Sequence, residues 1–213
     1  NCSISIDNEL NTIFSSGELM GISLWAVDGV VIQGCDFNNT ITETNPDLFN
    51  KNEGRALVAY NSSFSLRGLY PEGASITEQD ESLYYRNTVN GFAMGVDVHN
   101  IDELTSVSIN RTDFMDNRIG AYIRNTKSAG LIRNAFEVPL LSSDQEYYSD
   151  ISTVGAHFKN SNRYIIEGNQ FYGTNEGDFG TDDLDAGLII ESSGDFTDDR
   201  VYGNQFDKLS YAT

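Results

Sequence analysis

The chain has 213 residues and carries 13 Lys and Arg against 32 Asp and Glu, which gives a net charge of −19. This charge disfavours a nucleic-acid binder and a polybasic membrane-surface module, because both need clustered basic residues. Hydrophobic residues make up 39% of the chain and aromatic residues 11%, which argues against the disorder that strong acidity otherwise indicates. No apolar run is long enough for a transmembrane helix. The length suffices for one domain with a sizeable core.

A short segment that ends in phenylalanine recurs along the chain. An apolar residue precedes each phenylalanine by five positions, and a small or polar residue, most often Asn, precedes it by two. The phenylalanines are Phe37, Phe114, Phe136, Phe171 and Phe206, and the residues two positions earlier are Cys35, Thr112, Asn134, Asn169 and Asn204. This agreement favours a repeat architecture over a β-sandwich, the alternative all-β fold.

A second segment, here called the anchor strand, recurs between the phenylalanine segments. Its copies begin at Gly21, Ala56, Gly95, Gly120, Gly155 and Gly187, at spacings of 25 to 39 residues. The second and fourth positions of every copy are apolar, and this alternation predicts a strand with one buried face.

Together the two segments predict a right-handed parallel β-helix, an all-β solenoid of about six to seven rungs. Equivalent residues of successive rungs then stack at about 4.8 Å, Phe on Phe and Asn on Asn. We expect the Asn of the turn to tolerate the left-handed conformation and to hydrogen-bond along its column. The second rung departs from the pattern, because counting from Leu66 places Leu69 at the Asn position and Pro71 at the Phe position. We expect the chain to make a longer excursion there, to about Asn90.

The order of strand, turn, Gly-Asn-x-Phe, variable loop and anchor strand resembles right-handed parallel β-helix repeat proteins. The stretches 24–30 (Leu-Trp-Ala-Val-Asp-Gly-Val) and 166–171 (Ile-Glu-Gly-Asn-Gln-Phe) resemble the large surface proteins that the type IX secretion system exports. The resemblance implies an extracellular or outer-cell-surface location. We therefore expect residues 1–213 to be a single β-helix segment of a longer chain, with adjoining β-helix segments as candidate neighbours.

The repeat gives the two cysteines a predicted position. If Ile4 takes the Phe position of a preceding rung, Cys2 takes the Asn position, which Cys35 occupies in the next rung. Cys2 and Cys35 should then be stacked neighbours. Such neighbours either form a disulfide or remain two thiols that fill small positions of the column.

Additional residues are predicted to form side loops at 38–55, 72–90, 137–154 and 172–186. The loops at 137–154 and 172–186 carry nine carboxylates and no Lys or Arg. Oxygen ligands at this density suit a hard cation, so Ca²⁺ is the candidate ligand, and no other cofactor is expected. A solvated acidic loop is the alternative. The candidate metal ligands are Asp178, Asp182, Asp183 and Asp185.

The outward position of the anchor strand places Asp97, Tyr122 and His157 in consecutive rungs. A carboxylate, a phenol and an imidazole suit acid–base chemistry, and parallel β-helix polysaccharide lyases and glycoside hydrolases carry catalytic residues on such a face. The alternative is a solvated mixed column. The Gly-His-Gly, Asn-Thr-Asp and Arg-Ile-Lys motifs of polygalacturonases are absent. Arg111 and Arg133, which share a turn column, are the candidates for stabilising an enolate.

Four aromatic residues are candidates for ligand contact. Tyr147 and Tyr148 lie in a side loop, while Trp25 and Tyr60 share the position just beyond the anchor strand, where packing at the edge of the core is the alternative role. We expect a non-catalytic structural or adhesive segment that contacts surface polysaccharide or another surface protein through its side loops. A polysaccharide lyase or glycoside hydrolase of the β-helix type is the alternative function.

Overall fold

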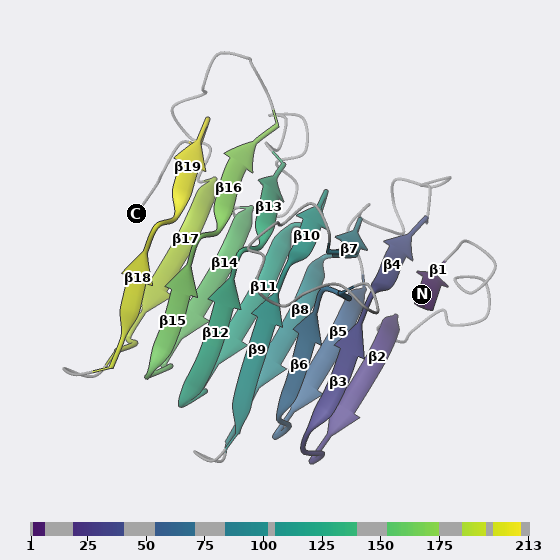
Figure 1. Cartoon of the computed structure of the whole chain (residues 1–213), viewed down its shortest axis with the longest axis horizontal. Coiled ribbons are helices and arrows are strands. Elements are labelled where there is room, and N and C mark those ends of the chain that lie inside the picture. Colours follow the sequence, from purple (N-terminus) through teal and green to yellow (C-terminus); the bar gives the residue numbers. More distant parts are fainter. Residues whose placement is uncertain are drawn as a thin grey trace, which may run out of the picture.

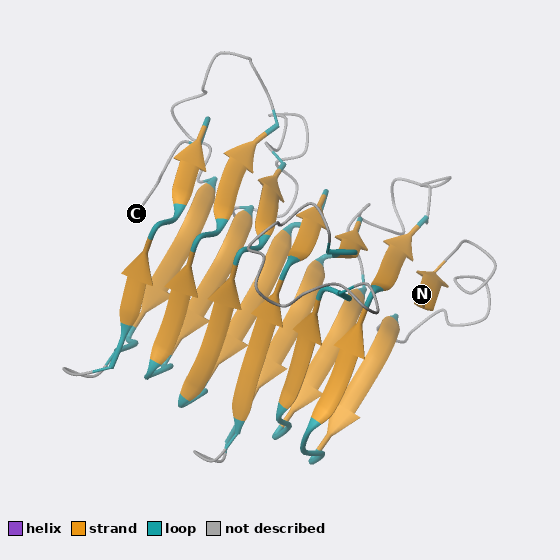
Figure 2. Cartoon of the chain, viewed as in Figure 1, coloured by secondary structure: helices purple, strands orange, loops and turns teal. Residues whose placement is uncertain are grey.

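The computed structural model describes residues 2–6, 19–40, 54–70, 84–101, 105–139, 153–174, 185–194 and 198–209. These residues form strands and turns and contain no helix. The predicted right-handed parallel β-helix is confirmed, because every pairing between the named strands is parallel and joins equivalent strands of successive rungs. Figure 1 shows the rungs stacked from the N-terminal strand to the C-terminal one, and Figure 2 shows that turns join the strands within a rung.

The strands belong to three sheets, which we call A, B and C. Sheet A contains β1 (Cys2–Ile6), β4 (Cys35–Asn39), β7 (Asn87–Asn90), β10 (Thr112–Met115), β13 (Ala135–Val138), β16 (Gln170–Gly173) and β19 (Gln205–Asp207). Sheet B contains β2 (Met20–Trp25), β5 (Arg55–Tyr60), β8 (Met94–His99), β11 (Ile119–Arg124), β14 (Val154–Lys159) and β17 (Ala186–Glu191). Sheet C contains β3 (Val30–Gln33), β6 (Phe64–Arg67), β9 (Ser106–Asn110), β12 (Ser128–Ile132), β15 (Tyr164–Glu167) and β18 (Arg200–Tyr202). In each rung the chain passes through a strand of sheet B, then one of sheet C, then one of sheet A. Strand β1 of sheet A precedes the first of these rungs.

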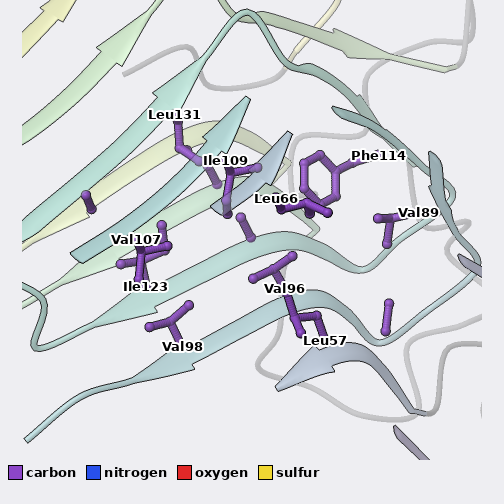
Figure 3. Packing of buried hydrophobic residues seen from close by; sticks show 14 of the residues in the cluster. Leu57, Leu66, Val89, Val96, Val98, Val107, Ile109, Phe114, Ile123 and Leu131 are labelled. Atoms are coloured by element: carbon purple, nitrogen blue, oxygen red, sulfur yellow. The ribbon is translucent and has the colours of Figure 1, made fainter. Parts of the chain in front are cut away.

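The core is a set of apolar columns inside the three sheets (Figure 3). The rings of Phe114, Phe136, Phe171 and Phe206 stack in sequence, with centroids 4.6, 4.8 and 5.0 Å apart and planes within 7° of parallel. Aliphatic side chains from sheets B and C fill most of the remaining interior, together with the aromatic rings of Phe64, Phe158 and Tyr164. The side chains of Leu57, Leu66, Ile109 and Leu131 are fully buried. The stacking follows from the register, because equivalent residues of parallel strands point to the same side.

The second rung completes its third strand later than counting from Leu66 indicates. Val89 pairs with Phe37 and Phe114, so it occupies the Phe column, and Asn87 occupies the Asn column. Leu69 does not take the Asn position but forms an isolated antiparallel bridge with Tyr85, and Pro71 lies outside the described residues. The additional residues lie between β6 and β7, and 71–83 are outside the described residues. The predicted side loop 72–90 therefore ends in a strand, β7.

Glycine at the start of the sheet B strands makes room for the phenylalanine column. A Cβ atom on Gly120 would lie 2.5 Å from the carbonyl oxygen of Gly155 and 2.7 Å from Cδ1 of Phe136. A Cβ atom on Gly95, Gly155 or Gly187 would also lie within 2.9 Å of Cδ1 of a phenylalanine ring. The second rung has Ala56 in place of this glycine and Val89 in place of the phenylalanine. The smaller valine side chain leaves room for the additional methyl group of the alanine.

A buried ladder of asparagines joins the rungs at the corner between sheets C and A. Oδ1 of Asn169 accepts hydrogen bonds from the backbone N–H and from Nδ2 of Asn134, at 2.9 and 3.0 Å. Oδ1 of Asn204 likewise accepts hydrogen bonds from the backbone N–H and from Nδ2 of Asn169. Nδ2 of Asn169 also donates to the carbonyl of Leu131. The expected hydrogen bonding along the column is thus present. The left-handed residues, however, are those that precede the asparagines, Arg133 and Gly168 (φ 54° and 63°).

A second polar ladder lies at the corner between sheets B and C. The backbone N–H of Ser62 donates to Oδ1 of Asn100, Nδ2 of Asn100 donates to Oγ1 of Thr126, and the N–H of Thr126 donates to Oγ of Ser161. All four side chains are fully buried. This ladder is not among the features expected from the sequence, although Asn-Ser or Asn-Thr follows the anchor strand at 61–62, 125–126 and 160–161 and marks its position.

The cysteines lie where the repeat predicts them. Cys2 of β1 pairs in register with Cys35 of β4, and Ile4 pairs with Phe37. Both cysteines are free thiols; Cys2 is exposed and Cys35 is buried. Burial, followed by a hydrogen bond with the Cys2 side chain, raises the pKa of Cys35 to about 11.

In the part of the chain that the structure describes, no helix has the length and apolar character needed to cross a membrane.

Replacement of Gly120 by Ala tests the glycine–phenylalanine corner. We expect Gly120→Ala to lower the free energy of unfolding by about 1–3 kcal/mol, because the new methyl group overlaps the next rung and the Phe136 ring. Gly130→Ala is the matched control, since the nearest atom to its Cβ would be 3.8 Å away and its effect should stay within about 0.5 kcal/mol. Urea unfolding measures both, and equal stabilities would contradict the steric account.

Candidate functional site: the outer face of sheet B

The outer face of sheet B carries most of the candidate residues that the structure describes. The register places Asp97, Tyr122 and His157 in consecutive rungs on β8, β11 and β14. Two outward columns run along this face. The first contains Ser23, Val58, Asp97, Tyr122, His157 and Ile189, and the second contains Trp25, Tyr60, His99, Arg124, Lys159 and Glu191.

Asp97 is enclosed by two arginines although it lies on the outer face. Its Oδ2 is 2.9 Å from a guanidinium nitrogen of Arg55, and its Oδ1 is 2.5 Å from one of Arg124. Arg55 comes from the preceding rung and Arg124 from the following one. Only 2% of Asp97 is exposed to solvent. A general base needs hydrogen-bond reach to its substrate, and this carboxylate is instead committed to a three-rung ion pair.

Tyr122 and His157 form a stacked pair beside this ion pair. Their ring centroids are 4.8 Å apart at an interplanar angle of 26°. The Arg124 guanidinium carbon lies 4.6 Å from the centroid of the Tyr122 ring, so Arg124 contacts both Asp97 and Tyr122. Such a cation–π contact contributes about 0.5–1 kcal/mol at a partly exposed site. The pair is packed as part of the face.

His157 also contacts the last rung through Glu191. Its Nε2 is 3.2 Å from Oε2 of Glu191, whose Oε1 is 2.8 Å from Nζ of Lys159. Burial lowers the pKa of His157, and the hydrogen bond with Glu191 opposes this shift. The hydrogen bond from Lys159 lowers the pKa of Glu191 and raises that of Lys159. His157 therefore favours the neutral form, and Glu191 favours the carboxylate.

The aromatic residues of the second column stack along the β-helix. Trp25 and Tyr60 have ring centroids 5.1 Å apart at 27°, and the ring of His99 meets Tyr60 at 5.2 Å and 73°. One face of the Trp25 ring lies against Tyr60, yet 64% of the residue is exposed. Its Nε1 donates to Oγ of Ser23 at 2.6 Å, which orients the indole. A sugar ring stacks on an aromatic face, and Trp25 presents the most exposed ring of this column.

The arginines that a lyase would use lie elsewhere. Arg111 and Arg133 occupy the corner between sheets C and A, whereas Asp97, Tyr122 and His157 lie on sheet B. The Arg111 guanidinium carbon is 3.8 Å from the centroid of the Tyr84 ring, and Arg86 pairs with Asp113 at 2.6 Å. The structure thus separates the two halves of the predicted catalytic set.

The candidate metal ligands are only partly covered by the structure. Tyr147, Tyr148, Asp178, Asp182 and Asp183 lie outside the described residues. Asp185 is buried at the corner between sheets A and B, where its Oδ1 accepts a hydrogen bond from Oγ1 of Thr153. Among the described residues, no group of three His, Cys, Asp or Glu side chains is arranged to hold a metal ion.

Comparison with known proteins does not add to this picture. No family model, no curated protein and no solved structure matches the chain.

Replacement of Asp97 tests its structural role. We expect Asp97→Asn to lower the free energy of unfolding by about 2–4 kcal/mol, because two partly buried arginines lose their common counter-charge. The matched control is Asp113→Asn, whose carboxylate is 30% exposed and pairs with one arginine, and its cost should stay below about 1 kcal/mol. Denaturant unfolding measures both. A more stable Asp97→Asn protein would instead indicate a residue retained for function.

Proposed function

We propose that the chain is a non-catalytic structural segment, a rigid rod-like part of an extracellular or cell-surface protein. The observation that carries the proposal is the uninterrupted pairing of rungs in all three sheets. In a solenoid each repeat contacts its neighbours, so stability and stiffness grow with the number of rungs. The phenylalanine stack adds side-chain contacts between rungs within sheet A, and the two polar ladders add them at the corners where strands end.

The state of Asp97 supports a structural role over an enzymatic one. A hydrolase needs an acid and a base that both reach the substrate, and a lyase needs a base together with a group that stabilises the enolate. Asp97 is enclosed by Arg55 and Arg124, and the imidazole of His157 is stacked on Tyr122 and bonded to Glu191. These residues act as connections between rungs in the proposed function.

Contact with a surface polysaccharide is the adhesive part of the proposal. It rests on Trp25, whose exposed indole is held by Tyr60 and Ser23, and stacking on an exposed aromatic ring is a general mode of sugar recognition. The side loops are the other candidate contact regions, for polysaccharide or for another surface protein. Export through the type IX secretion system is proposed from the sequence resemblance alone, and the full-length gene with its sorting signals tests it.

Incubation with polysaccharides tests the proposed function. The protein should bind an immobilised surface polysaccharide and should release neither reducing ends nor unsaturated sugars from acidic or neutral substrates. Trp25→Ala should weaken binding about tenfold, which corresponds to a loss of about 1.4 kcal/mol of binding free energy with the stacking contact. Val31→Ala is the matched control, because Val31 is exposed on the neighbouring strand β3 and should bind as the unmodified protein does.

Each outcome separates the candidate functions. Release of product would overturn the structural assignment in favour of the polysaccharide-active enzyme. Equal binding by Trp25→Ala and Val31→Ala would remove the sheet B face as the contact and leave the side loops. Absence of binding to every polysaccharide would restrict the proposal to a spacer that contacts proteins.

A further inference from the structure

The N-terminal strand brings two thiols together at one edge of the β-helix. Cys2 and Cys35 are partners in the parallel register of β1 and β4, so their Cα atoms are separated by about 4.8 Å and their side chains point to the same side. Disulfides span Cα distances of about 4.4–6.8 Å. The Cys35 thiol also donates a hydrogen bond to the carbonyl of Gln33 at 3.5 Å, within its own corner of the β-helix. The fold thus meets the positional requirement for a disulfide without a change of register.

We propose that Cys2 and Cys35 are an oxidation site, at which a low-molecular-weight disulfide converts the two thiols into a bond that joins β1 to β4. The proposal does not depend on the proposed function, because it concerns the edge of sheet A and not the face of sheet B.

The exposure of the two cysteines sets the order of the steps. Cys2 is exposed and reacts first: its thiolate attacks the small disulfide, forms a mixed disulfide and releases one small thiolate. The buried Cys35 thiol then loses its proton, and the thiolate attacks the Cys2 sulfur and releases the second small thiolate; because burial raises the pKa of Cys35 to about 11, this is the slower of the two steps. The two protein thiols are oxidised by two electrons, the small disulfide is reduced to two thiols, and these take up the two protons.

The position of β1 gives the bond a structural consequence. Within the described residues β1 pairs only with β4, and its side chains at positions 2, 3 and 5 are exposed. Strands at a sheet edge open most readily, because few contacts hold them. A disulfide to β4 restrains β1 and closes the chain between residues 2 and 35.

Oxidised glutathione is the probe for this site. The folded protein is equilibrated with it, the remaining thiols are blocked, and peptide mapping without reduction locates the bond. We expect a monomer with a Cys2–Cys35 disulfide, and about tenfold slower amide exchange in β1 than in the reduced protein. Two unreacted thiols, a stable glutathione adduct on Cys2 or a disulfide-linked dimer would each overturn the proposal.

A shift of the cysteine by one residue is the matched control. In the double variant Cys2→Ser, Ser3→Cys the new thiol is opposite Asp36 and points to the other side of sheet A. This variant keeps two cysteines and the same chain length, and it should form no intramolecular disulfide under the same conditions. If it forms the bond as readily as the unmodified protein, the register does not determine the reaction and the proposal is wrong.

Discussion

The structure depends on one constraint, the in-register stacking of each rung on the next. Parallel pairing places equivalent residues above one another, so every column needs side chains that tolerate their own kind as neighbours. Phenylalanines satisfy this by stacking their rings, and aliphatic residues by packing. The glycines at the start of the sheet B strands follow from the same constraint, because the phenylalanine rings and the next rung's backbone occupy the space that a Cβ atom would need. In the second rung, where Val89 takes the place of a phenylalanine in this column, Ala56 takes the place of the glycine.

The corners pose a second problem, because strands end there and their backbone groups are buried. An unpaired buried N–H group costs about 1–3 kcal/mol. The protein meets this with side chains of the neighbouring rung, as Asn169 does for the backbone N–H of Asn134 and Ser161 for that of Thr126. The turns are therefore hydrogen-bonded along the β-helix like the strands. The ion pair of Asp97 extends the principle to the outer face, where it connects three rungs.

The sequence predicts the features that repeat with little interruption. The Phe column, the anchor strands and the cysteine pairing are visible because most connections within a rung keep a constant length. The position of Val89 is not visible, since the additional residues between β6 and β7 break the count. The two arginines around Asp97 also escape prediction, because they come from the rungs before and after it. The left-handed conformation belongs to Arg133 and Gly168, since the asparagines after them must point inward to bond along the column.

The polar ladder at the corner between sheets C and A requires each rung to stack in register on the next, so amide hydrogen exchange at this ladder tests the constraint directly. The backbone N–H groups of Thr112, Asn134 and Asn169 follow turns, and each donates to an asparagine side chain of the next rung. Measured by NMR on the folded protein, these three amides should exchange as slowly as the amides in the middle of the sheet A strands. Exchange at the rate of exposed turn amides would show that the ladder does not hold the rungs together, and would contradict the account.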